Sequence, residues 1–289
     1  MRGTTFIAAN ELIQENKRII LLASREQIRV LATAPKIFAD GTFKTCPALF
    51  AQLYVLKAEL SGGHRVVLMF ALLPDKTEHT YSHMLRKIRT LVMAETGQVW
   101  SPRMIMTDFE SGMIPALAQE LPNSKHQGCF FHFTKALYNK IKEMGALTEF
   151  RANAGFQKNF YLKCALPFVQ HDKMAHVSAL IDQQYNAPDE FNQYFNGFWI
   201  SHARMLSLVD SLDTRTNNVS EGFNSAFGRQ VVANPNFWNF LKKFKQEEAL
   251  FFVTMAQIEE GARPPLPRYI IHSQVFPQFT SLKLSLNKI

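Results

Sequence analysis

Along the chain, apolar positions recur with two periods, one typical of strands and one typical of helices. An apolar run over residues 37–39 ends in Asp40, and residues 50–56 are rich in side chains that favour strands. Residues 66–73 are apolar throughout, which predicts a strand buried on both faces of a sheet that helices cover. Because a short turn at residues 61–64 separates the second and third strands, we expect an antiparallel meander.

Helical spacing dominates after this meander. Residues 80–96 place apolar side chains on one face of a helix and basic side chains on the other. A fourth strand is expected over residues 103–107, followed by a helix that opens at Thr107–Glu110 and continues to Leu121. A short fifth strand is expected at residues 128–132, before another amphipathic helix.

The rest of the chain is predicted to be mainly helical. No strand pattern occurs between about residue 145 and residue 213, so this block is interpreted as a helical insertion, and a last long helix carries apolar residues from Phe237 to Ile258. Ahead of the meander, a short strand is expected at residues 18–22 and a short helix at residues 24–32. The predicted division is a lead-in segment, the first part of the sheet domain, the helical insertion, C-terminal helices that complete the domain, and an extended tail, at residues 1–35, 36–144, 145–213, 214–260 and 261–289.

Acids at the ends of two strands form the first candidate site. Asp40 ends the first strand of the meander and Asp108 follows the fourth strand. A three-stranded meander, a helix, a strand and a helix, in this order, are typical of a ribonuclease-H-like α/β fold, with a mixed sheet of antiparallel meander plus parallel strands flanked by helices. In that topology the first and fourth strands are neighbours, so the two carboxylates converge and repel unless a cation lies between them. Oxygen ligands suit Mg²⁺ or Mn²⁺, and a third acid would complete a two-metal site for attack on a phosphodiester.

Several short motifs, in their order and spacing, resemble one protein family. They are Asp40–Lys44, Pro47, Phe50–Leu53, Thr107–Glu110, Cys129-x-x-His132 and Arg215–Asn224. Together they are similar to the Mutator-like element (MULE) transposases of eukaryotes, over roughly residues 30 to 260. The resemblance implies a DDE transposase core with an all-helical insertion before the last catalytic helix. It also implies that Asp40, Asp108 and Glu221 are the catalytic acids that bind Mg²⁺ or Mn²⁺, that DNA is the substrate, that the protein works in the nucleus, and that it forms a homo-oligomer.

Each acid also has a simpler structural interpretation. Asp40 before Gly41 is compatible with a turn residue. Thr107-x-x-Glu110 has the pattern of a capping box, which we favour as the role of Glu110 while keeping Asp108 as the ligand. Glu221 occupies the third helical position after Asn218, where a glutamate caps a helix or binds metal. Asp213 is the alternative third acid.

Cys129 and His132 have a spacing that also occurs in zinc sites, but such a site needs four ligands. His126 could supply one further ligand, and Cys164, His171 or His176 another, yet none of these forms a second clear pair. We therefore favour a structural or DNA-positioning role for Cys129 and His132 over metal binding.

Composition supports a nucleic-acid partner. The 289 residues carry a formal net charge of +8, and basic chains commonly meet polyanions. The residues expected to contact phosphate are Lys135, Lys140, Lys142, Arg229, Lys242 and Lys243. No apolar stretch is long enough to span a membrane, and no signal-peptide pattern occurs at the N-terminus. Three scattered cysteines favour an intracellular, reducing compartment, and the lack of a glycine-rich phosphate loop argues against a nucleotide cofactor.

The sequence therefore predicts a DNA transposase core that hydrolyses a phosphodiester and then joins the freed 3′-hydroxyl to target DNA. Three cysteines cannot build the zinc modules that such transposases usually carry beside the core. The chain is then a core fragment, a decayed copy or a partner-dependent protein. The alternative function is a domesticated regulator that binds DNA or protein without catalysis, and a ribonuclease or repair nuclease on the same fold is a third hypothesis.

Overall fold

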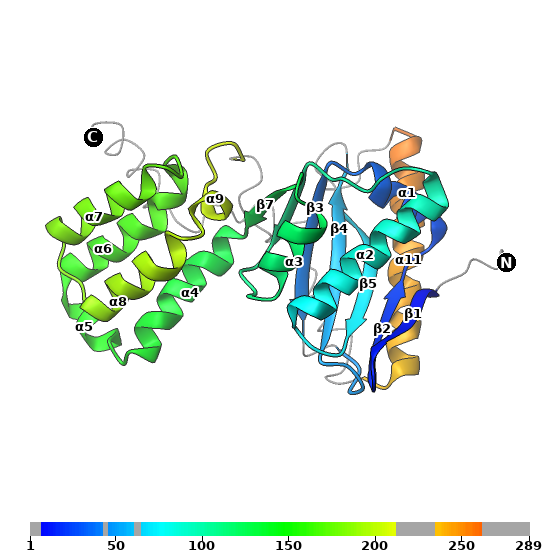
Figure 1. Cartoon of the computed structure of the whole chain (residues 1–289), viewed down its shortest axis with the longest axis horizontal. Helices are drawn as coiled ribbons and strands as arrows, with labels where there is room; N and C mark the ends of the chain where they lie inside the picture. Colours follow the sequence, from blue (N-terminus) through cyan, green and yellow to red (C-terminus); the bar gives the residue numbers. More distant parts are fainter. Residues whose placement is uncertain (1–6, 43–45, 61–64, 212–234, 262–289) are drawn as a thin grey trace.

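A computed structural model describes residues 7–42, 46–60, 65–211 and 235–261 of the chain. It has two parts, a sheet with helices on both faces and a helical unit beside it, and helix α4 (Phe130–Glu143) leads from the first part into the second (Figure 1). In the described residues, no helix combines the length and the apolarity that crossing a membrane requires.

The sheet is mixed and has seven strands in the described residues. They are β1 (Ile7–Gln14), β2 (Lys17–Leu22), β3 (Lys36–Thr42), β4 (Gln52–Glu59), β5 (Arg65–Leu73), β6 (Met104–Thr107) and β7 (Lys125–Gly128). Their order is β1-β2-β5-β4-β3-β6-β7. Strands β3, β4 and β5 form the predicted antiparallel meander, whereas β6 pairs parallel with both β3 and β7. The mixed sheet flanked by helices is therefore confirmed, and its strand order is compatible with the ribonuclease-H-like arrangement.

Helices cover both faces of this sheet. Helices α1 (Arg25–Thr33), α2 (Glu78–Thr96) and α3 (Met113–Glu120) lie on one face, and the long helix α11 (Phe237–Glu259) lies on the other (Figure 1). Alternate strand residues supply the two cores: Leu21 faces the first set of helices, while Leu22 faces α11. On the α11 side, Phe70 of β5 packs edge-on against Phe244 at a centroid distance of 4.8 Å. Burial of both faces explains why β5 is apolar throughout.

The helical unit has its own aromatic core. The helical unit comprises α4, α5 (Leu147–Ala152), α6 (Ala154–Ala165), a 3₁₀ turn (Leu166–Phe168), α7 (Met174–Gln184), α8 (Asp189–Tyr194), a π-helical turn (Phe195–Trp199) and α9 (Ala203–Leu206). This core contains a buried ammonium group: Lys163 Nζ lies 2.9 Å from Asp182 Oδ1 and 2.8 Å from Asn192 Oδ1. Because a buried cation is costly unless it is paired, these partners fix how α6, α7 and α8 pack.

Three elements differ from the sequence prediction. Strand β1 was not predicted, because it is an edge strand whose residues are mostly exposed and lack a clear apolar face. The fifth strand is β7, residues 125–128, and Cys129 is already the N-cap of α4. The helix after Asp108 begins only at Met113, with Gly112 as its N-cap.

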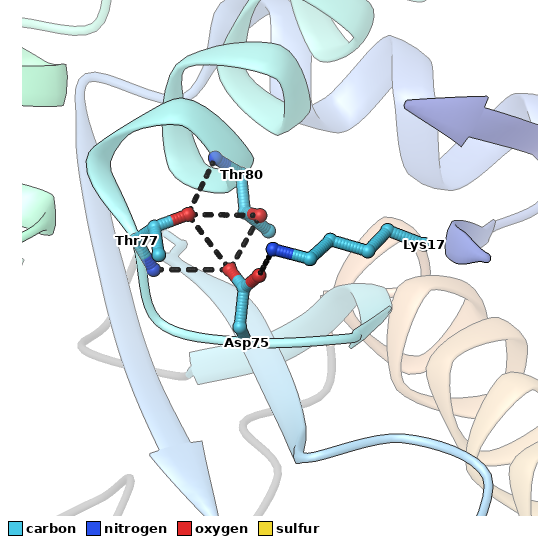
Figure 2. Close-up of polar contacts among 4 residues, drawn as sticks. All are labelled: Lys17, Asp75, Thr77 and Thr80. Atoms are coloured by element: carbon cyan, nitrogen blue, oxygen red, sulfur yellow. Dashed lines mark hydrogen bonds and ion pairs between the residues drawn. The ribbon is translucent and has the colours of Figure 1, made fainter. Parts of the chain in front are cut away.

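The start of α2 is fixed by a carboxylate. The Asp75 carboxylate lies between Thr77, Thr80 and Lys17 (Figure 2). Its Oδ1 accepts hydrogen bonds from the hydroxyls of Thr77 (2.8 Å) and Thr80 (2.6 Å), and its Oδ2 lies 2.8 Å from Lys17 Nζ. Burial raises the pKa of Asp75, but the Lys17 ammonium and the two threonines lower it by more. The pKa of Asp75 is therefore well below its usual range. The turn at residues 75–77 is therefore held between β2 and α2.

Replacing Asp75 should destabilise the fold in a pH-dependent way. We expect Asp75→Ala to lower the free energy of unfolding at pH 7 by about 2 kcal/mol, because the hydrogen bonds from Thr77 and Thr80 and the Lys17 pair are lost together. Asp75→Asn keeps an acceptor for the threonines and should lose less. Since the pKa of Asp75 in the folded protein lies below the ordinary aspartate value of 3.8, this stabilisation is present above about pH 4 and is lost as the pH falls toward the folded pKa. Urea unfolding at pH 7 and pH 3 measures the effect, and a wild-type value for Asp75→Ala at pH 7 would contradict it.

Candidate active site

Sheet register places the two predicted acids side by side. In the parallel pair of β3 and β6, Ile37 lies opposite Ile105 and Phe38 lies opposite Met106. The same register, carried two residues further, brings Asp108, directly after β6, opposite Asp40. Asp40 does not end β3 as predicted, because the strand continues for two more residues, to Thr42, paired with β4. Electrostatics agree with this position, since the Asp40 carboxylate is close enough to raise the pKa of Asp108.

An apolar floor lies beneath the two acids. Alternation along the strands puts Asp40 on the same face as Phe38, and Asp108 on the same face as Met106. Phe38, Met104, Met106 and Cys129 form one buried cluster on this face, each at most 5% exposed. The two acids therefore lie next to a buried apolar surface of the sheet, from which water is excluded.

Burial changes the protonation of both acids. It raises the pKa of Asp40 to about 6, while the Lys57 ammonium and the Gly41 N–H act in the opposite direction. Burial, followed by the neighbouring charges of Glu110 and Asp40, raises the pKa of Asp108 to about 8. Two carboxylates in such a setting resist carrying two negative charges at once unless a cation joins them.

Glu110 belongs to the site and does not cap a helix, so the predicted capping box is wrong. Its carboxylate accepts hydrogen bonds from the Tyr81 hydroxyl and from Lys76 Nζ. The Thr107 hydroxyl instead donates to the main-chain oxygen of Asp108, at 2.7 Å, and so must accept from His126 Nε2, also at 2.7 Å. The sequence pattern predicts a cap because the partners of Glu110 are distant in the sequence: Tyr81 lies on α2 and Lys76 in the turn before it.

Two tyrosines lie next to the acids. The Tyr54 ring is 1% exposed and packs 5.5 Å from the Tyr81 ring. Burial, then the charge of Asp108, raises the pKa of Tyr54 well above its ordinary value, so the phenol stays protonated. No described residue makes a hydrogen bond with the Tyr54 hydroxyl. A buried O–H donor is thus within electrostatic reach of the acids.

The loop after β6 is also attached to the helical unit. The Phe109 ring packs edge-on against Trp199 at a centroid distance of 4.6 Å. On its other side it covers Gly128, where a Cβ would come within 2.2 Å of Phe109 Cζ. Gly128 is therefore required by this close approach, and Phe109 joins the end of β6 to the core of the helical unit.

The first turns of α4 face the acids. Cys129 is fully buried in the apolar floor, which agrees with a structural role. Burial, together with the Lys135 charge, lowers the pKa of His132, and the Glu110 carboxylate opposes this shift. In the described part of the chain, no group of three or more His, Cys, Asp and Glu side chains is arranged to hold a metal ion. A zinc site at Cys129 and His132 therefore gains no support from its described surroundings.

The predicted phosphate contacts fall in different surroundings. Lys135 is exposed, and its charge lowers the pKa of Asp40, so it lies near the acids. Lys140 instead pairs with Glu190 at 2.7 Å, which raises the pKa of Lys140. Lys142 lies over the Tyr138 ring, 4.7 Å from its centroid.

The remaining predicted residues lie on α11 or outside the described residues. Lys242 is exposed on α11, and Lys243 lies 3.3 Å from Glu247 on the same helix. Arg229, the predicted third acid Glu221 and the alternative acid Asp213 are all in residues 212–234, outside the described residues.

Sequence reasoning missed four residues of this site. The sequence predicts a capping role for Glu110, and it predicts only strand and helix positions for Gln52, Tyr54 and Tyr81. A signal existed in β4, since Gln52 is 0% exposed and donates a hydrogen bond to the Tyr81 hydroxyl at 2.6 Å. A buried amide in a strand indicates a polar partner on a neighbouring element.

Crowding at Gly128 can be tested by mutation. Gly128→Ala should lower the free energy of unfolding by about 2 kcal/mol, because Phe109 must leave its place against the strand. Gly197→Ala is the matched control, since a Cβ there would meet no atom within 4 Å. Urea denaturation of both variants measures the effect. Equal stability of the two variants would show that Phe109 does not hold the loop as described.

The comparison with protein families agrees with this geometry. Residues 36–136 match the family model of the MULE transposase domain. The matched stretch runs from the start of β3 into α4 and contains Asp40, Asp108, Glu110, Cys129, His132 and Lys135. No curated protein matches the chain. Over residues 36–136, the chain is therefore similar to the MULE transposase domain.

Proposed function

We propose that this chain is the catalytic core of a DDE transposase that binds Mg²⁺ or Mn²⁺ and acts on DNA. The observation that carries the proposal is the register of the adjacent parallel strands β3 and β6, which, extended by two residues, puts Asp40 of β3 opposite Asp108 directly after β6. The strand order β5-β4-β3-β6-β7 supports a ribonuclease-H-like core, in which β1 and β2 are additional edge strands. The family match over residues 36–136 supports the transposase assignment.

The chemistry of the two acids fits a hard divalent cation. Both side chains offer oxygen ligands, which Mg²⁺ and Mn²⁺ prefer. Without a cation, burial makes ionisation of both carboxyls less favourable, and the Asp40 charge adds to this cost for Asp108, as the raised pKa values of the two acids indicate. A bound cation would offset this cost. Asp40 and Asp108 would be two ligands, and Glu221, outside the described residues, is proposed as the third.

In this proposal the side chains act mainly by position and charge. The bound metal ions would supply Lewis-acid activation of water and of the scissile phosphate. Asp40 and Asp108 would hold their carboxylates in fixed directions at the ends of two strands, so little reorganisation is needed. Lys135, near Asp40, would contact the DNA phosphate, and the apolar floor would exclude water from beneath it. Hydrolysis would release a 3′-hydroxyl, and this hydroxyl would then attack target DNA.

The acids should be essential for cleavage but not for folding. We expect Asp40→Asn and Asp108→Asn each to lower Mg²⁺- or Mn²⁺-dependent nicking of supercoiled plasmid DNA by about a hundredfold or more. The control is Asp189→Asn, an exposed residue of α8 in the helical unit. Circular dichroism checks that the variants fold. Wild-type nicking by either acid variant would contradict the proposal. A wild type that binds DNA but never nicks it would favour the regulator, and a preference for RNA would favour the ribonuclease.

The lysines of α4 should contribute unequally to DNA binding. Lys135→Met should weaken binding to duplex DNA and lower the slope of log K against log salt by about one, because one phosphate contact is lost. Lys140→Met should have a smaller effect, since Lys140 is already paired with Glu190. Fluorescence anisotropy across a salt series measures both variants. Equal losses, or a larger loss for Lys140→Met, would show that the DNA does not pass beside the acids.

A further inference from the structure

The segment Asp108–Gly112, here called the β6 exit loop, carries one of the two acids and is held at several points. Phe109 anchors it to the helical unit through Trp199. At its other end, a Cβ on Gly112 would come within 2.3 Å of the main-chain oxygen of Lys76, so the loop lies directly against the turn before α2. The middle of the loop is held by Glu110.

Glu110 has partners on both of its carboxylate oxygens. The Tyr81 hydroxyl donates to Oε2 and Lys76 Nζ donates to Oε1. Lys76 is 42% exposed, so its bond to Glu110 is partly open to solvent. The Glu110 side chain is only 13% exposed and Tyr81 is fully buried, so water competes little for the bond between these two. Hydrogen bonds to a charged group in such surroundings are among the stronger ones in proteins.

The partners of Glu110 are themselves fixed. Tyr81 Oη accepts a hydrogen bond from Gln52 Nε2 at 2.6 Å, which ties α2 to β4. Lys76 follows Asp75 in the turn that the threonines and Lys17 hold (Figure 2). Glu110 is therefore attached to a rigid corner formed by β2, β4 and the start of α2.

This attachment reaches Asp108 directly. The Glu110 N–H donates to Asp108 Oδ1 at 3.4 Å, and the two residues are separated by one position in the loop. Resting on the function proposed above, we propose that Glu110 is a positioning residue of the active site, which fixes the direction of the Asp108 carboxylate through its bonds to Tyr81 and Lys76. Both of its side-chain oxygens have partners on α2 and the preceding turn, so Glu110 serves the loop and not the metal.

A double-mutant cycle tests this role. Glu110→Ala and Tyr81→Phe should each lower the maximal Mn²⁺-dependent nicking rate of supercoiled plasmid by about tenfold or more, because a small displacement of a catalytic group costs much of its rate. Because both act through one contact, the double variant should be no slower than Glu110→Ala. Glu110→Gln keeps an acceptor for the Tyr81 hydroxyl and should recover most of the rate. A merely structural role would instead lower thermal stability in proportion to the loss of rate.

Glu95→Ala is the matched control, since Glu95 is a 15%-exposed carboxylate that pairs with Arg25 and Arg29 at the far end of α2. It should leave the maximal rate unchanged. Wild-type rates for Glu110→Ala and Tyr81→Phe, or losses that multiply in the double variant, would overturn the positioning role while the proposed function stands.

The wild type separates the two proposals further. If it binds Mn²⁺ but does not nick DNA, weaker Mn²⁺ binding by Glu110→Ala and Tyr81→Phe supports the positioning role, and equal binding overturns it. If the wild type neither binds Mn²⁺ nor nicks DNA, the proposed function and the positioning role both fail.

Discussion

The structure depends on one constraint: two carboxylates lie close together above a buried apolar surface. Strands β3 and β6 run parallel, so their ends meet at one edge of the sheet, and the register brings Asp40 and Asp108 to the same level there. The apolar floor of Phe38, Met104, Met106 and Cys129 excludes water from that side of both acids. Such a pair is unfavourable in a protein without a ligand, because each charge raises the cost of the other. A cation bound between the two carboxylates would make the arrangement favourable.

The surrounding elements can be understood as supports for these two carboxylates. The turn at residues 75–77 and the start of α2 hold one side of the β6 exit loop through Lys76 and Tyr81. The helical unit holds the other side, because Phe109 packs on Trp199, and Phe133 of α4 packs on the same ring at 4.8 Å. The two cores of the protein therefore meet at the loop that carries Asp108. Rigid support on both sides is what a site that acts by preorganised charge requires.

Much of the sheet could be predicted from the sequence, because its signals are local. The apolar run of β5 and the helical period of α2 each indicate one element. Asp40, near the end of β3, and Asp108, directly after β6, stand out as acids that follow apolar residues. The role of Glu110 could not be predicted in this way. Thr107 and Glu110 have the spacing of a capping box, and only tertiary contacts with Lys76 and Tyr81, at least 29 residues away, assign the carboxylate elsewhere. The place of Tyr54 in the site could not be predicted for the same reason, since the acids whose charges act on its hydroxyl are distant in the sequence.

The most direct test is crystallographic. An anomalous difference map from crystals of the whole chain grown with Mn²⁺ should show a peak within about 2.0–2.6 Å of carboxylate oxygens from both Asp40 and Asp108. A map without a peak between these two side chains, at a Mn²⁺ concentration that occupies other sites, would contradict the central claim that the two acids form one metal-binding corner.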